Sequence, residues 1–209
     1  MKIYIVRHGK SESNKINTLF NGNYNDNLTE QGLNQAKALG ILFREFKLDV
    51  LFSSPLKRAV QTAQEISNGH IKSLPIITDD RLTELNPGIF DGLTYDEIMA
   101  KYKSIFEDRK RDKLNYIIPG GESYVMLRDR LDSFLREVYS KNAGSSILIV
   151  THATAIKLFL LLLTSKSLEE IEKEDYTNTC WFEFDLSFRG EQYETKNLAF
   201  NRIDHLKNG

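Results

Sequence analysis

Four stretches of the chain have the hydrophobic pattern of β-strands. Ile3–Val6, Val50–Phe52 and Ile147–Val150 are short, continuous apolar runs, which is typical of strands buried on both faces of a parallel sheet. From Phe182 to Leu186 apolar and acidic residues alternate instead, and this pattern predicts a half-exposed strand. Arg189-Gly190 then indicates the turn of a hairpin near the end of the chain.

Other segments carry apolar residues at intervals of three and four, which is the spacing of amphipathic helices. Thr29 is expected to cap the first helix, and Ser54 and Pro55 are expected to be the cap and the first residue of the second. The apolar positions are Leu33, Ala36, Leu39, Phe43 and Phe46 in the first helix, Leu56, Ala59, Ala63 and Ile66 in the second, and Tyr124, Leu127, Leu131, Phe134 and Val138 in a third. A further apolar helix is predicted over 153–163, whereas the region from about 67 to 121 is predicted to be polar and irregular. Strands that alternate with helices predict a three-layer α/β/α fold with a mostly parallel central sheet.

Composition narrows the class of protein. The 209 residues contain no repeat and no low-complexity linker, so a single domain over 1–209 is expected. Lys and Arg number 28 against 29 Asp and Glu, and the resulting net charge of −1 argues against nucleic acid or a membrane surface as partner. Cys180 is the only cysteine, which excludes intramolecular disulfides and cysteine-cluster metal sites. No apolar run is long enough to span a bilayer and the first residues lack a secretion signal, so a soluble cytoplasmic protein is expected.

Polar and charged residues follow three of the predicted strands. Arg7-His8 follows the first, Ser53–Pro55 follows the second with Arg58 one helical turn further on, and Thr151-His152 follows the third. Because ligands collect beyond the carboxyl ends of parallel strands, two histidines and two arginines are expected to meet in one crevice. Guanidinium groups and helix N-termini suit a phosphate group. The same guanidinium groups disfavour a protonated imidazole, and a neutral histidine is able to attack phosphorus as a nucleophile.

Several motifs, taken in order, resemble those of one enzyme family. Arg7-His8-Gly9 resembles the signature of the histidine phosphatase superfamily, whose fold is phosphoglycerate-mutase-like. The other matching segments are Asn14, Gly22 and Leu28–Gly32 with Gln35-Ala36; Ser53–Ala59 with Gln61–Ala63; Leu82–Leu85 with Gly88 and Asp91–Thr94; Pro119–Ser123; Val150–His152; and Asn201 with His205-Leu206. Each motif alone is a weak signal. Their shared order, with each motif at an expected strand end or loop, makes the resemblance strong and extends it over nearly the whole chain.

The resemblance implies a mechanism that needs neither a metal nor a cofactor. His8 would attack phosphorus and form a phosphohistidine. The phosphoryl oxygens would be held by Arg7, Arg58, Asn14 and His152. Glu84 would protonate the leaving alkoxide and would then activate the water that releases phosphate. The carboxylates that compete with it for this acid role are Asp79, Asp80, Asp91 and Glu97.

Contacts to the rest of the substrate are expected from the first loop and from a lid, or specificity region, over about 93–121. The candidates in the first loop are Phe20, Gly22, Asn23 and Tyr24. The lid contains the basic stretch Arg109-Lys110-Arg111 with Lys113, which is interpreted as a solvated helix face; if it faced the crevice, a second phosphate or carboxylate on the substrate would be expected. Lys10 and Asn27 depart from the family pattern. Lys10 is interpreted as a solvated lysine, the alternative being that its charge favours a more anionic substrate.

The combined prediction is a phosphomonoesterase that hydrolyses a small phosphorylated metabolite through a phosphohistidine. A cofactor-dependent phosphoglycerate mutase is the alternative, which is disfavoured because the segment between Leu93 and Gly120 is shorter than in similar mutases and Pro119–Ser123 looks more like the phosphatase branch. A non-catalytic phosphate-binding module is the third hypothesis, but such modules usually lack the nucleophile. The sequence leaves the ester open, and exposed apolar edges in the last hairpin would permit a homodimer.

Overall fold

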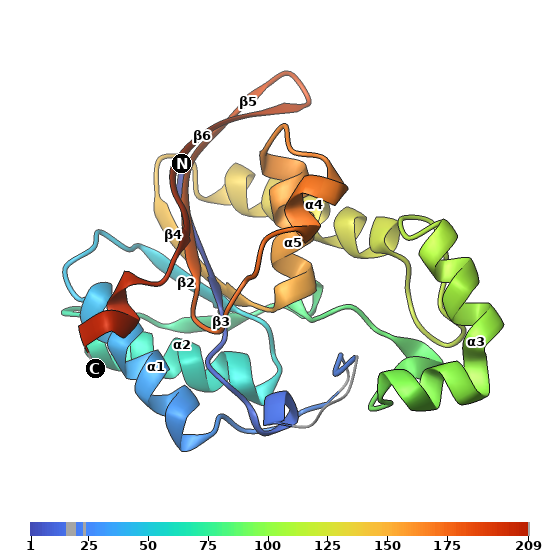
Figure 1. The fold of residues 1–209 in the computed structure, drawn as a ribbon. Helices are drawn as coiled ribbons and strands as arrows, with labels where there is room; N and C mark the ends of the chain where they lie inside the picture. The colour runs from blue at the N-terminus through green and yellow to red at the C-terminus, as the bar shows by residue number, and fades with distance from the viewer. Residues whose placement is uncertain (16–19, 23, 209) are drawn as a thin grey trace.

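A six-stranded sheet forms the centre of the molecule in the computed structural model, which describes residues 1–15, 20–22 and 24–208 (Figure 1). The strands are β1 (Lys2–Arg7), β2 (Val50–Ser53), β3 (Ile76–Thr78), β4 (Ser146–Thr151), β5 (Trp181–Arg189) and β6 (Gln192–Arg202). Their order across the sheet is β3-β2-β4-β1-β5-β6. The first four strands in this order run parallel, whereas β5 pairs antiparallel with both β1 and β6. The predicted mostly parallel sheet and its terminal hairpin are therefore confirmed.

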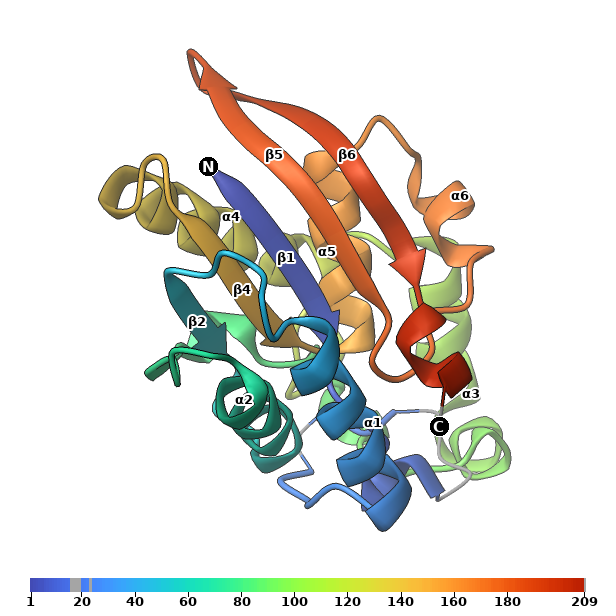
Figure 2. The same ribbon diagram turned by 90° about the vertical axis from the view of Figure 1, so that its left-hand side faces the viewer.

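Helices cover both faces of the sheet. In Figure 2, α1 and α2 lie in front of it, and α4 and α5 lie behind it. The helices are α1 (Glu30–Leu42), α2 (Lys57–Gly69), α3 (Tyr95–Arg111), α4 (Tyr124–Lys141), α5 (Ala153–Leu163) and the short α6 (Leu168–Glu172), with single 3-10 turns at Glu12–Lys15, Asp80–Leu82, Gly88–Phe90 and Asp204–Asn208. Each face has its own hydrophobic core, one built mainly with α4 and α5 and the other with α1 and α2. This is the expected three-layer α/β/α architecture.

The parallel strands end level with one another, and this determines where the polar residues gather. Arg7 at the end of β1 pairs with Thr151 at the end of β4, and Ser53 at the end of β2 pairs with Val150. His8 and His152, which come next in the chain, are therefore brought to the same edge of the sheet.

Two glycines let α1 approach this edge. A Cβ atom on Gly32 would lie 2.0 Å from the carbonyl oxygen of Lys10, and a Cβ atom on Gly9 would lie 2.5 Å from the carbonyl oxygen of Gly32. Any side chain at either position would push the first turn of α1 away from the loop after β1. Thr29 caps that turn as predicted, since its hydroxyl accepts a hydrogen bond from the Gly32 amide at 2.9 Å.

The predicted start of the second helix is wrong by two residues. α2 begins at Lys57, and its N-cap is Leu56 rather than Ser54. The amide of Ser54 still donates to the Val150 carbonyl at 3.0 Å, so the backbone there continues the strand, and the Ser54 hydroxyl is bonded to His152. Pro55 consequently lies in the turn before the helix.

The prediction of an irregular middle region is also wrong, because it contains α3. A capping box between Thr94 and Glu97 starts this helix, and Tyr102 interrupts it with a non-helical φ of −136°. Only Ile98 and Arg109 of α3 are buried, so its apolar face is too narrow to show the usual helical periodicity. The helix stands beside the body of the molecule, at the right of Figure 1. Within the described part of the chain, no helix combines the length and apolar character needed to cross a bilayer.

Candidate active site

A cavity of about 220 Å³ opens at the edge of the sheet where β1, β2 and β4 end. This is the place where open α/β sheets bind their ligands. The described lining residues are Arg7, His8, Ser13, Asn14, Phe20, Asn21, Gly22, Arg58, Glu84, Leu85, Ala153 and Thr154. Seven of the residues predicted to act on the substrate are among them, and they come from segments that lie far apart in the sequence.

His8 lies in this cavity with a defined tautomer. Its ring Nδ1 is 2.7 Å from the Gly9 carbonyl oxygen, and because a carbonyl only accepts, Nδ1 carries the proton and Nε2 keeps its lone pair. The residue is only 3% exposed. Burial, together with the charges of Arg58 and Arg7, lowers the pKa of His8 well below its usual value. The imidazole is therefore neutral at physiological pH and has a free lone pair.

His152 lies directly behind His8 and does not line the cavity itself. The two rings have centroids 5.0 Å apart, and the Nε2 atom of His152 is 2.8 Å from the Ser54 hydroxyl. Its Nδ1 atom has no hydrogen-bond partner among the described residues. Burial and the nearby charge of Arg58 lower the pKa of His152 well below its usual value, so this ring is neutral as well.

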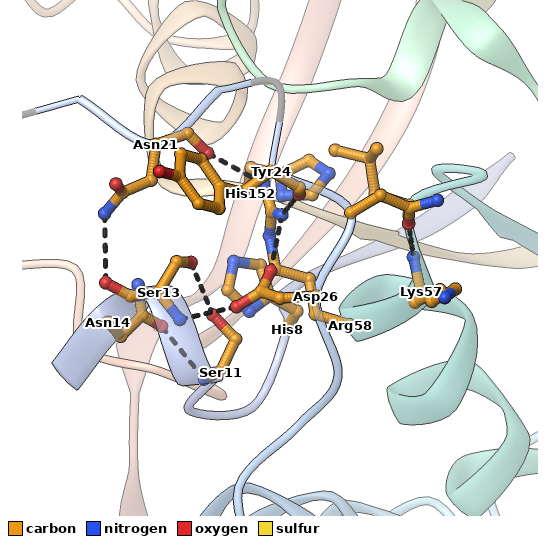
Figure 3. A network of polar contacts seen from close by, with 12 residues as sticks. His8, Ser11, Ser13, Asn14, Asn21, Tyr24, Asp26, Lys57, Arg58 and His152 are labelled. Carbon is orange, nitrogen blue, oxygen red and sulfur yellow. Dashed lines mark hydrogen bonds and ion pairs between the residues drawn. The ribbon is translucent and has the colours of Figure 1, made fainter. Parts of the chain in front are cut away.

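Arg58 is positioned by the first loop, as Figure 3 shows. Its guanidinium forms an ion pair with Asp26 at 3.1 Å and donates to the carbonyl oxygens of Tyr24 and Asn21. Burial alone would raise the pKa of Asp26, but hydrogen bonds from Ser13 and the Arg58 charge hold it below its usual value. The ion pair therefore persists, and it fixes the arginine where it lines the cavity. Asp26 was missed by the sequence analysis, because a single acidic residue in a loop carries no pattern.

Arg7 is held from the opposite side. Its guanidinium donates to the Tyr176 carbonyl, which belongs to the loop between α6 and β5. Its Nε atom is buried and has no hydrogen-bond partner within the described residues. Burial lowers the pKa of Arg7, although a guanidinium remains charged at physiological pH. Two cations thus face the cavity with donors to spare for an anion.

The side chain of Glu84, which follows the 3-10 turn Asp80–Leu82, lies against the first turn of α5. One carboxylate oxygen accepts from the Thr154 amide at 3.0 Å, and the other accepts from the amide of Leu85 at 2.7 Å. Its backbone is held by Arg130, whose guanidinium donates to the Glu84 carbonyl at 2.9 Å and also binds Glu122. Arg130 was missed by the sequence analysis, because it is an unremarkable charged position on α4.

The competing carboxylates lie elsewhere. Asp79 forms an ion pair with Arg81, and Glu97 caps α3. Neither these two nor Asp80 and Asp91 line the cavity, so Glu84 supplies the only carboxylate among its described lining residues. No group of three metal-ligating side chains gathers in the described part of the chain.

The predicted substrate contacts are only partly brought together. Asn14, Phe20 and Gly22 line the cavity. Tyr24 does not; its side chain is 41% exposed, and its contribution is the carbonyl oxygen that binds Arg58. Asn23 lies outside the described residues. Lys10 donates to Gln31 at 3.1 Å and lies outside the cavity.

The interpretation of the basic stretch as a solvated helix face is wrong for Arg109. Lys110 and Arg111 are exposed, but Arg109 is only 6% exposed. Its guanidinium carbon lies 5.1 Å from the ring centroid of Phe20 and 5.4 Å from that of Tyr124. One of the three consecutive basic residues turns inward, because successive residues on a helix point in directions about 100° apart.

Comparison with known proteins identifies the family. A model of the histidine phosphatase superfamily (branch 1) matches residues 3–199. The chain belongs to this superfamily. It is 32% identical to phosphoserine phosphatase 1 of Hydrogenobacter thermophilus over 81% of this chain and 79% of that protein. It is also 33% identical to a 2,3-bisphosphoglycerate-dependent phosphoglycerate mutase of Cytophaga hutchinsonii, over 83% of this chain and 82% of that protein.

A solved structure has the same fold. The mycobacterial glucosyl-3-phosphoglycerate phosphatase, in complex with a vanadium oxide, superimposes with a TM-score of 0.82 over 97% of this chain and 99% of its own, at 22% sequence identity. The family, the fold class and the phosphatase chemistry predicted from sequence are confirmed. This member of the histidine phosphatase superfamily is a phosphoric monoester hydrolase.

Proposed function

We propose that this histidine phosphatase hydrolyses a small phosphate monoester that carries a second anionic group, and that the phosphoryl group passes through His8. The transfer through His8 rests on family membership and on the neutral His8 ring in the cavity. The second anionic group rests on one observation: Arg109 is buried against Phe20, a residue that lines the cavity.

In the first step the Nε2 lone pair of His8 attacks phosphorus, an N–P bond forms and the P–O bond to the alcohol breaks. Arg7, Arg58 and the amide of Asn14 donate to the phosphoryl oxygens and stabilise the charge that develops on them. His152 lies next to the attacking ring and is neutral, so it adds no charge of its own to the phosphate site. Its neutrality keeps the phosphate-binding charge on the two arginines.

Glu84 acts first as the general acid and then as the general base. It gives a proton to the leaving alkoxide as the P–O bond breaks, and it then takes a proton from the water that attacks the phosphohistidine. The second step forms inorganic phosphate and restores neutral His8 and protonated Glu84. The position of the carboxyl at the first turn of α5, on the cavity wall, supports this role.

The burial of Arg109 indicates that the rest of the substrate carries a negative charge. A buried cation is costly unless an anion accompanies it. In the described part of the chain, Arg109 forms no ion pair with a carboxylate; it contacts the aromatic faces of Phe20 and Tyr124 instead. Arg109 is not itself a lining residue, but it packs on the ring of Phe20, which lines the cavity, and there we place the anion at the far end of a bound ester.

Lys157 adds positive charge to the same region, whereas the charge of Lys113 is paired with Glu172. Lys157 is half-buried one helical turn beyond the cavity-lining Ala153 and Thr154. Burial lowers its pKa, and the charges of Glu172 and Lys113 act on it in opposite directions. A carboxylate or a second phosphate fits these cations.

The named substrates of the relatives support the same chemistry. Phosphoserine and phosphoglycerate each join a phosphate monoester to a carboxylate, and 2,3-bisphosphoglycerate has two phosphates. All three combine the reacting phosphate with another anion within a small molecule.

The experiment is a set of matched substrate pairs. Phosphoserine is compared with phosphoethanolamine, which lacks the carboxylate, and a hexose bisphosphate is compared with its monophosphate. We expect kcat/KM to favour the member with the second anion by about 10- to 100-fold, the worth of one or two charge-assisted hydrogen bonds. The Arg109→Met variant should lose this preference while hydrolysing para-nitrophenyl phosphate normally, and the exposed Lys110→Met variant should keep it.

Equal rates within both pairs for the unmodified protein would contradict the second anion, and an unchanged preference in Arg109→Met would remove Arg109 from its recognition. A second assay with the same protein tests the mutase alternative. Supplied with 3-phosphoglycerate and a catalytic amount of 2,3-bisphosphoglycerate, the protein should release inorganic phosphate, as followed by phosphorus NMR. Rapid formation of 2-phosphoglycerate would instead make it a mutase.

A further inference from the structure

The loop between α6 and β5 crosses the end of β1 and binds it at several points. Besides the Tyr176 carbonyl that accepts from Arg7, the Cys180 carbonyl accepts from the Arg7 amide at 3.0 Å. The carbonyl oxygen of His8 accepts from the Thr179 amide at 3.3 Å and from the side-chain amide of Asn178 at 3.0 Å. The backbone of the attacking histidine is therefore tied to this loop.

The loop is held in a demanding conformation. Thr179 is fully buried and has a φ of +62°, in the left-handed region that a β-branched residue rarely adopts. Its hydroxyl bonds to the ring of His205 at 3.1 Å. A conformation of this kind persists only where the surrounding contacts impose it, and it turns the neighbouring Asn178 toward β1.

Asn178 also fixes the side chain of Asn14. The Oδ1 atom of Asn14 accepts from the Ser11 amide at 3.1 Å and from the Nδ2 atom of Asn178 at 3.2 Å. An amide oxygen has two lone pairs, and both are used here. The Asn14 oxygen is consequently held away from the cavity that the residue lines, and its NH2 group is left as the part that donates to a ligand.

We propose that Asn178 is a positioning residue for phosphoryl transfer: it sets the amide of Asn14 so that NH2, and not the oxygen, faces the phosphoryl group. Asn178 does not line the cavity and touches no substrate. The inference rests on the proposed function, because that proposal assigns Asn14 to the phosphoryl oxygens. Without Asn178, the Asn14 amide is able to rotate and to present its oxygen to an anion, which repels it.

A double-mutant cycle tests this coupling. Asn178→Ala should lower kcat about tenfold and should weaken inhibition by vanadate, which mimics the phosphoryl group in transfer, by a similar factor. In the Asn14→Ala background the same Asn178→Ala change should cost less than about twofold, because the group through which it acts is gone. Asn178→Asp, which keeps the shape of the side chain and removes both donors, should behave at least as badly as Asn178→Ala.

Asn201→Asp is the matched control. Its amide donates to the Asp175 carbonyl at 2.9 Å, so it also braces this loop, but it contacts neither His8 nor Asn14. It should leave vanadate inhibition unchanged. An equal cost of Asn178→Ala in both backgrounds, or equal losses in Asn178→Asp and Asn201→Asp, would overturn the proposal and leave only a general stiffening role for the loop. Failure of the phosphate contact and failure of the positioning role give different results. Full activity in Asn14→Ala would contradict the contact between Asn14 and the phosphoryl group. A slow Asn14→Ala variant beside a normal Asn178→Ala variant would contradict only the positioning role of Asn178.

Discussion

The two ends of the cavity are built in different ways. At the phosphoryl end, the residues lie on or shortly after the parallel strands and are held by polar contacts, as with Arg58 on Asp26 and His8 on Gly9. At the proposed leaving-group end, Phe20 lines the cavity, and Arg109 of α3 packs on the rings of Phe20 and Tyr124 and meets no carboxylate in the described part of the chain.

This difference separates chemistry from specificity. Arg7 and the two histidines lie at the ends of strands of the sheet, so we expect the phosphoryl end to be held nearly as rigidly as the core. α3 has only two buried positions, so we expect the region proposed to recognise the rest of the ester to be freer to vary. Substituting residues at one end of the cavity at a time tests whether the function of the other end changes.

The largest effect is expected where the two ends meet, at Glu84. Glu84→Gln should slow esters with poor leaving groups by about 10²- to 10⁴-fold, because the alkoxide then departs without a proton. Activated aryl phosphates, whose leaving groups need no proton, should be slowed far less. The measurement is kcat for an alkyl and an aryl phosphate with the same enzyme preparation, and equal slowing of both would place the acid at another residue.

A change confined to the phosphoryl end should affect every substrate alike. Arg58→Met should lower kcat about 10²- to 10³-fold for esters with and without a second anion, since the lost donors serve the transferred group alone. The exposed neighbour Lys57 is the control, and Lys57→Met should keep its activity. A loss in Arg58→Met that depended on the leaving group would contradict the separation of the two ends.

The smallest effect concerns stability and pH. Burial lowers the pKa values of His8, His152 and His205 in the folded protein, whereas in the unfolded chain they titrate near 6.5. The unfolded state therefore binds more protons below that pH, and the free energy of unfolding should fall as the pH is lowered from 7 to 5, by at most about 1.4 kcal/mol per pH unit for each histidine. The measurement is the free energy of unfolding in urea at a series of pH values. A stability that rose on acidification would contradict the neutral buried rings.

The same contrast explains what could be predicted from the sequence. His8 and His152 lie directly after apolar runs that only a strand accounts for, so their meeting follows from the parallel sheet. Arg109 was misread because the burial of one arginine in a basic stretch depends on the direction in which α3 faces, and the low apolar content of that helix does not encode it. Asp26 and Asn178 act through contacts between distant loops, and no local pattern records such a pairing.

The central claim is that the phosphoryl group passes through His8. The direct measurement is to mix the protein with a phosphorus-labelled ester, quench in alkali within milliseconds and locate the label by peptide mapping. We expect an acid-labile, alkali-stable phosphohistidine on His8 that is absent from His8→Ala. Label that survives in His8→Ala, or that resides on another residue of the unmodified protein, would contradict it.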